Sequence, residues 1–208
     1  MIFVLPGMGA DSGMFTGSWR QLPDTVFIDW PSYQGEQTLT EIAGRIVALH
    51  DIPDDVVVIG TSLGGMVACE IAKLRRLRRL VLIGSAVHPR EINTLLTTLR
   101  PLAKYAPVDL LQMLATSAPG ELARMFTRTD PEFIRATLQA IFTWTGIDPA
   151  QSPPLRIHGK HDRVIPPSDH ADLVLEGGHL IAMTHASECC DFIIKNLNNS
   201  STTPVSHP

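Results

Sequence analysis

Short apolar runs alternate with longer stretches of helical periodicity along most of this 208-residue chain. Six runs are continuously or almost continuously apolar, which is typical of strands buried on both faces of a parallel sheet. The predicted strands are Ile2–Leu5, Val26–Trp30, Val56–Ile59, Leu80–Ile83, Leu155–His158 and Asp172–Leu175. This alternation predicts an α/β fold, with a mostly parallel sheet of about six strands flanked by helices.

Three further stretches have the character of core helices. In Leu39–Leu49, apolar residues recur at intervals of three and four, so one face of the helix is apolar. The stretch Gly64–Leu74 is apolar over most of its surface, which is typical of a helix inside a domain. A last helix, expected over Ala182–Asn196, would cover the end of the sheet.

The middle of the chain, from Pro89 to Trp144, has no strand pattern. Four helical stretches punctuated by prolines occupy it instead: Glu91–Tyr105, Val108–Thr116, Gly120–Phe126 and Pro131–Thr143. We interpret this insertion as a helical cap over the carboxyl edge of the sheet, where open α/β sheets bind their ligands. The predicted division is a core of residues 1–87 and 150–197, a cap of residues 88–149 and a flexible tail of residues 198–208.

Composition and charge narrow the classes of function. Lys and Arg number 17 against 21 Asp and Glu, and this mild acidity argues against nucleic acid or an anionic membrane as partner. No segment approaches the ~18 apolar residues that span a bilayer, and the first basic residue, Arg20, comes too late for a secretory signal. Three cysteines, Cys69, Cys189 and Cys190, are too few for a disulfide framework. We interpret them as reduced thiols, which favours a cytoplasmic location.

The pattern G-x-S-x-G occupies residues 60–64, with Ser62 at its centre. It directly follows an apolar strand and directly opens a helix, as a nucleophile elbow does. Side chains at Gly60 and Gly64 would collide with the neighbouring strand and helix, which explains the two glycines. The alternative is an ordinary strand–turn–helix in which the serine caps the helix.

A serine hydroxyl becomes a nucleophile only when a base removes its proton. His179 follows the last predicted strand and is the candidate base. Asp162 follows the preceding strand and is the candidate carboxylate that orients the imidazole. The alternatives are a loop histidine without catalytic duty and a turn-forming aspartate.

The other histidines fit this chemistry less well. We expect His158 to pack at the end of its strand, His161 to face solvent and His88 to have a structural role. The histidines and acids lack the helical ligand spacing of a site such as H-E-x-x-H, so no metal site is expected.

An oxyanion hole needs two backbone donors near the nucleophile. The Leu63 N–H follows the serine directly, and the glycine-rich loop Pro6–Asp11 after the first strand offers the Met8 N–H as the second donor. Such donors are typically worth ~3–4 kcal/mol each in the transition state. The alternative for the loop is a plain turn between strand and helix.

These motifs together resemble the α/β-hydrolase superfamily over nearly the whole chain, and most closely its small capped esterase-like members. The matching segments are LPGMG, GTSLGGMVACEIA, RRLVLIGSA, IHGKHDRVIP and EGGH. The chain order serine, aspartate, histidine also matches. The resemblance implies an eight-stranded sheet, here reduced to six strands, and acyl hydrolysis through an acyl-serine without a cofactor.

The chain departs from this family pattern at two places. Pro6-Gly7 opens the oxyanion loop where many relatives have His-Gly. Between Val164 and Asp172 there is room for barely one helical turn where relatives usually insert a helix. This shortening would expose one edge of the sheet and suggests a homodimer.

The predicted function is therefore a serine hydrolase that acts on a small or medium carboxylic ester. The apolar cap stretches favour an uncharged small-molecule acyl substrate. A thioesterase or acyltransferase and a carbon–carbon hydrolase would use the same triad. A ligand-binding protein that keeps the fold without turnover is the alternative of a different class.

Overall fold

The computed structural model describes residues 1–92, 120, 124–125, 128–148 and 153–199. Most of the predicted cap stretches Glu91–Tyr105, Val108–Thr116 and Gly120–Phe126, and the tail from residue 200, lie outside these residues. The division into core and cap therefore stays a prediction, and the fourth cap helix is the one that can be compared with the structure.

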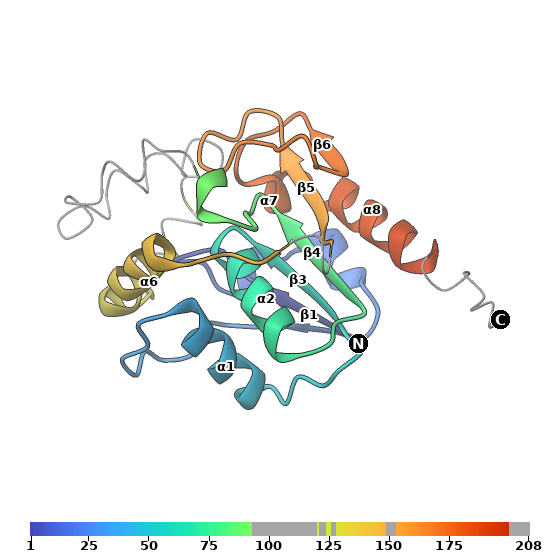
Figure 1. Ribbon diagram of the computed structural model, residues 1–208. Helices are drawn as coiled ribbons and strands as arrows, with labels where there is room; N and C mark the ends of the chain where they lie inside the picture. Colours follow the sequence, from blue (N-terminus) through green and yellow to red (C-terminus); the bar gives the residue numbers. More distant parts are fainter. Residues whose placement is uncertain (93–119, 121–123, 126–127, 149–152, 200–208) are drawn as a thin grey trace.

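Six strands form one sheet in which every neighbouring pair is parallel (Figure 1). They are β1 (Ile2–Leu5), β2 (Thr25–Phe27), β3 (Val57–Thr61), β4 (Arg79–Ile83), β5 (Leu155–Gly159) and β6 (Leu173–Leu175), in the order β2-β1-β3-β4-β5-β6. Ile59 at the centre of β3 pairs with Val4 of β1 and Val81 of β4. The predicted fold class is confirmed, because continuous apolar runs are buried from both sides.

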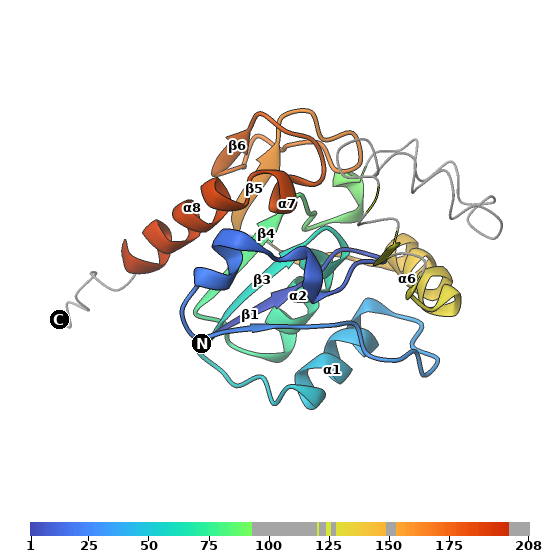
Figure 2. The same cartoon turned by 180° about the vertical axis from the view of Figure 1, so that it is seen from behind.

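Helices cover both faces of the sheet (Figures 1 and 2). One face carries α1 (Leu39–Leu49), α2 (Leu63–Leu74) and α6 (Pro131–Thr143). The opposite face carries the 3-10 helices η1 (Ser12–Met14) and η2 (Gly17–Gln21), with α7 (Ile181–Thr184) and α8 (Ala186–Asn199). A third 3-10 helix, η3 (Pro89–Glu91), follows the end of β4.

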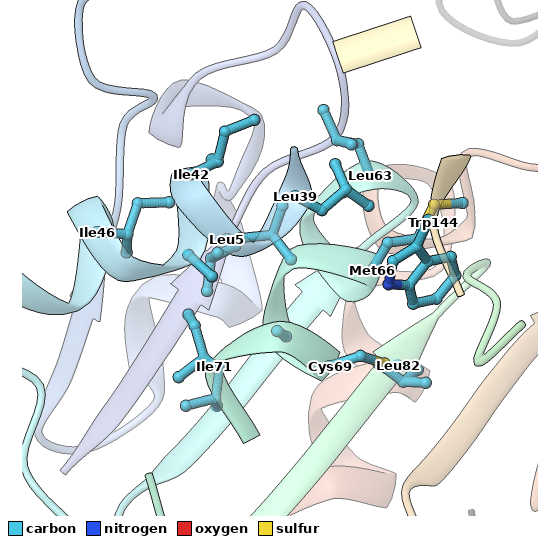
Figure 3. Close-up of a cluster of buried hydrophobic side chains, with 14 of the residues drawn as sticks. Leu5, Leu39, Ile42, Ile46, Leu63, Met66, Cys69, Ile71, Leu82 and Trp144 are labelled. Atoms are coloured by element: carbon cyan, nitrogen blue, oxygen red, sulfur yellow. The ribbon is translucent and has the colours of Figure 1, made fainter. Parts of the chain in front are cut away.

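Each face has its own apolar core, because alternate residues of a strand point to opposite sides. Figure 3 shows the first core, which contains side chains of β1, α1 and α2 together with Trp144, the residue that follows α6. The second core gathers Phe15 and Trp19 against α8. The α1 helix begins with a capping box in which Thr38 and Glu41 satisfy each other's backbone amides.

Among the predicted elements that the structure describes, most agree with it to within two residues at each end, and two differ more. The strand expected over Val26–Trp30 ends at Phe27, and beyond it the Trp30 indole donates to the Gly7 carbonyl (3.0 Å) in the loop after β1. The helix expected over Ala182–Asn196 is divided at His185 into α7 and α8. At the division the Ala182 carbonyl accepts the indole N–H of Trp19 at 2.6 Å, so η2 binds to the helix break.

The three cysteines are buried and free. Burial raises the pKa of Cys189 and of Cys190 to about 12, and it raises the pKa of Cys69 further. The thiols are therefore protonated at neutral pH. Within the part of the chain that the structure describes, no helix has the length and apolar character to cross a membrane.

Candidate active site

Ser62 occupies a sharp turn between β3 and α2. Its backbone has φ 52° and ψ −120°, a conformation that is uncommon for a residue with a side chain. Gly60 and Gly64 make this turn possible. A Cβ on Gly60 would lie 2.2 Å from the Gly64 carbonyl oxygen, and a Cβ on Gly64 would lie 2.4 Å from the Pro6 carbonyl oxygen. The steric argument from the sequence is therefore confirmed at both glycines.

The Ser62 hydroxyl does not cap α2. Its Oγ lies 2.9 Å from Nε2 of His179, which is 117 residues away in the sequence. The backbone is also tied to the next strand, since the Ser62 N–H donates to the Ile83 carbonyl at 3.1 Å. The interpretation of Ser62 as an ordinary helix cap is wrong.

His179 and Asp162 form the second contact of this group. Nδ1 of His179 lies 2.8 Å from Oδ2 of Asp162, and both side chains are buried. The other carboxylate oxygen, Oδ1, accepts the N–H groups of Val164 and Ile165 at 2.8 and 2.9 Å. The aspartate thus makes a turn with one oxygen and contacts the imidazole with the other, so the turn-forming role is observed and the catalytic role stays a prediction.

Close backbone packing sets the position of His179. A Cβ on Gly159 would lie 2.2 Å from the Gly178 carbonyl oxygen and 2.6 Å from the Gly177 carbonyl oxygen. The backbone at the end of β5 therefore packs directly against Gly177 and Gly178, the two residues before His179. The His161 N–H donates to the Gly177 carbonyl at 2.9 Å and fixes the same loop from the other side.

Gly84, which follows β4, lies beneath the histidine and the aspartate. A Cβ on Gly84 would meet the His179 carbonyl oxygen at 3.1 Å and Oδ2 of Asp162 at 3.5 Å. Its φ of +51° is readily adopted only by glycine. The candidate residues therefore meet at one edge of the sheet, at the ends of β3, β4 and β5 and in the loop after β6.

The loop after β1 lies beside the elbow. A Cβ on Gly7 would lie 3.7 Å from Cβ of Ser62. The Gly7 carbonyl accepts the Trp30 indole at 3.0 Å and the Ala10 N–H at 3.2 Å, which holds the loop in place. Neither the Met8 N–H nor the Leu63 N–H donates to an acceptor among the described residues. Both amides are thus free for a ligand.

The three other histidines with a sequence-based expectation lie as expected. His88 accepts the Arg90 N–H and so caps η3, while His161 is exposed beside Glu176. His158 is completely buried in β5, and neither of its ring nitrogens has a hydrogen-bonding side chain within the part of the chain that the structure describes. Burial, with the nearby charge of Arg156, lowers the pKa of His158 to about 4.

Two buried polar groups near the site were not predicted. Glu70 of α2 is almost completely buried, and its carboxylate accepts the Trp144 indole (2.7 Å), the Thr40 hydroxyl (2.7 Å) and the Lys73 ammonium. Arg156 of β5 forms a bidentate ion pair with Glu91 of η3. The sequence signal that could have found them is a charged residue inside an apolar segment. Such a residue is buried only when it has a partner, so it indicates a buried ion pair or hydrogen bond.

The role of Ser85 in this packing was not predicted from the sequence either. The residue is completely buried behind the elbow, and its hydroxyl donates to the Ser62 carbonyl at 2.7 Å. No sequence motif distinguishes this serine from a residue that simply ends a strand.

The arrangement allows a proton to move between the Ser62 hydroxyl and the His179 imidazole. The imidazole of His179 lies between a hydroxyl and a carboxylate, so it can accept the hydroxyl proton while the carboxylate stabilises the resulting imidazolium. Among the described residues, no cluster of histidine, cysteine and acidic side chains could hold a metal ion.

Comparison with models of known protein families finds a match over almost the whole chain. The model of the alpha/beta hydrolase family matches residues 2–192. No protein in the curated set matches the chain significantly.

Many solved structures are similar in fold at low sequence identity. An esterase from Thermogutta terrifontis has 18% identity and a TM-score of 0.75, covering 97% of this chain and 90% of its own. An enol-lactonase from Burkholderia xenovorans has 19% identity and a TM-score of 0.68, with coverages of 95% and 91%. A thioesterase of the prodiginine pathway in Streptomyces coelicolor has 18% identity and a TM-score of 0.67, with coverages of 92% and 88%.

Proposed function

The chain belongs to the alpha/beta hydrolase family, and from this membership we propose that it is a serine hydrolase of small or medium carboxylic esters. The observation that supports the proposal most is the position of the His179 ring. One ring nitrogen lies 2.9 Å from the Ser62 hydroxyl and the other 2.8 Å from the Asp162 carboxylate. A histidine with only a structural role does not need a nucleophile on one side and a carboxylate on the other.

In the proposed first step, the Ser62 Oγ attacks the carbonyl carbon of the ester while its proton passes to Nε2 of His179. Asp162 holds the ring in the tautomer that presents a free Nε2 and stabilises the imidazolium. The carbonyl oxygen becomes an oxyanion, which the amides of Met8 and Leu63 bind. The bond to the leaving alcohol then breaks, and the imidazolium returns its proton to that alcohol.

The second step repeats the same movements with water. His179 takes a proton from water, whose oxygen attacks the acyl carbon of the acyl-serine. The second tetrahedral intermediate collapses, the bond to Ser62 breaks and the proton returns to the serine oxygen. The products are a carboxylic acid and a free enzyme.

Two features support an uncharged acyl substrate. Met8, whose amide is a proposed oxyanion donor, has an apolar side chain that is almost entirely buried in the first core, so it brings no charge to this position. The predicted cap stretches are rich in leucine, methionine and phenylalanine. The esterase and enol-lactonase among the structural relatives fit an oxygen leaving group, and the thioesterase makes sulfur the first alternative to test.

The decisive experiment is covalent labelling with a fluorophosphonate, followed by mass spectrometry of the modified peptide. We expect modification at Ser62 in the native protein and none in Ser62→Ala. The variant Ser168→Ala, at a half-buried loop serine, is a matched control and should label like the wild type. A native protein that stays unlabelled would support the non-catalytic alternative.

Turnover separates the remaining possibilities. A panel of nitrophenyl esters and acyl thioesters of increasing chain length reports the leaving group and the depth of the acyl pocket together. Ser62→Ala should lower kcat by roughly 10³-fold or more, because the hydroxyl is the attacking group. Near-normal turnover in this variant would refute the proposal.

A further inference from the structure

We propose that Ser85 is a positioning residue that aims the Leu63 amide at the oxyanion, an inference that rests on the proposed function above. Ser85 follows β4 and is completely buried. Its hydroxyl donates to the Ser62 carbonyl oxygen at 2.7 Å. That carbonyl and the Leu63 N–H belong to the same peptide unit, so a hydrogen bond to one end of the unit determines the direction of the other end.

The peptide unit needs such a support because its conformation is uncommon. Ser62 has a positive φ, and a rotation of the unit would turn the Leu63 N–H away from the nucleophile. The Ser62 carbonyl also accepts the amides of Gly65 and Met66 at 3.0 and 3.3 Å, but these come from the same helix. Ser85 supplies the hydrogen bond that ties the unit to a different element.

The same hydrogen bond also acts on the electronic character of the peptide. A donor on the carbonyl oxygen draws electron density through the amide and makes its N–H a better donor, since hydrogen-bonded groups polarise one another in a low-dielectric interior. The Leu63 N–H would therefore bind a developing negative charge more strongly when the Ser85 hydroxyl is in place.

Other residues hold Ser85 in this position. Its carbonyl lies 3.5 Å from Nη2 of Arg156, whose guanidinium is itself fixed by Glu91. Gly65 provides the space that the hydroxyl fills, since a Cβ there would lie 2.3 Å from the Ser85 Oγ. A buried ion pair on one side and a glycine on the other thus fix the serine beneath the elbow.

The test compares Ser85→Ala with Thr137→Val. Thr137 is also completely buried, and its hydroxyl also donates to backbone carbonyls, at 2.8 and 3.0 Å, but within α6. We expect Ser85→Ala to lower kcat roughly tenfold with little change in KM, because the lost interaction supports the transition state. Thr137→Val should keep the wild-type kcat.

A trifluoromethyl ketone provides a readout that stability alone would not change. Its adduct with the active serine carries an oxyanion, so Ser85→Ala should weaken its inhibition by the same factor by which kcat falls. Ser85→Cys should recover part of both losses, since a thiol is a weak donor.

The possible outcomes separate this inference from the proposed function. If the wild type is labelled by the fluorophosphonate but Ser85→Ala keeps wild-type kcat and inhibition, the inference is refuted and the proposed function stands. A lowered melting temperature with unchanged kcat would give Ser85 a purely structural role and refute it equally. A wild type that neither labels nor turns over would overturn both.

Discussion

Two buried histidines lie near the carboxyl edge of the sheet, and of these two only His179 has side-chain partners on its ring nitrogens among the described residues. The side chain of His179 is 6% exposed, and both of its ring nitrogens face a polar side chain. His158 in β5 is 0% exposed, and neither of its ring nitrogens has a hydrogen-bonding side chain among the described residues; its polar neighbour is the backbone of Ile165. Burial alone therefore does not distinguish His179 from His158. The polar side chains that face the ring nitrogens of His179 do.

The largest expected effect is on turnover. His179→Ala should lower kcat by roughly 10³-fold or more, because the proposed base is lost. His158→Leu replaces a buried ring without side-chain partners by an apolar side chain of similar size, so kcat should stay near the wild-type value. Steady-state kinetics with a nitrophenyl ester measures both. A loss of activity in His158→Leu alone would reverse the assignment of the two histidines.

The next effect is on acid stability. The pKa of His158 is lowered to about 4 in the folded protein, against ~6.5 in an unfolded chain. Between these values the unfolded state binds the extra proton, so the free energy of unfolding falls as the pH falls. The loss over this window should be about 3 kcal/mol, and it is absent above pH ~6.5, where the ring is neutral in both states.

Urea denaturation at several pH values from 7.5 to 4.5 measures this loss. In His158→Leu, the free energy of unfolding should depend less on pH than in the wild type. His170→Ala, which removes an exposed imidazole, should retain the wild-type pH dependence. A slope that is the same in wild type and His158→Leu would contradict the buried neutral histidine.

The smallest effect concerns Glu70, a buried carboxylate that has the side-chain partners that His158 lacks. Trp144→Phe removes the indole N–H that donates to Glu70 at 2.7 Å, and it should lower the free energy of unfolding by about 2 kcal/mol. The cost should shrink when Glu70→Gln is already present, because the charge is then gone. A double-mutant cycle by urea denaturation measures the coupling. Equal costs in both backgrounds would show that the charge is irrelevant to the contact.

The sequence predicted the fold well where one local signal decides the structure. β1, α1 and α6 have the predicted bounds, because an apolar run or an amphipathic period with caps is sufficient for each. The glycines around Ser62 indicated the elbow through simple steric exclusion. The neighbouring positions of Ser62, Asp162 and His179 followed from the rule that parallel strands present their carboxyl ends at one edge.

Long-range contacts account for what the sequence could not predict. The break between α7 and α8 occurs where Trp19 donates to the Ala182 carbonyl, 163 residues away in the chain. The contact of Ser85 with the Ser62 carbonyl depends on how two strand ends pack. Periodicity describes one element at a time, so it carries no information on such pairings.

The protonated thiols of Cys69, Cys189 and Cys190 have a practical consequence. Alkylating reagents attack the thiolate, so the folded protein offers them no reactive sulfur. Alkylation of a cysteine therefore reports that the interior has opened. With all three cysteines of the chain shielded in this way, the rate of alkylation measures spontaneous opening of the native state without an introduced probe.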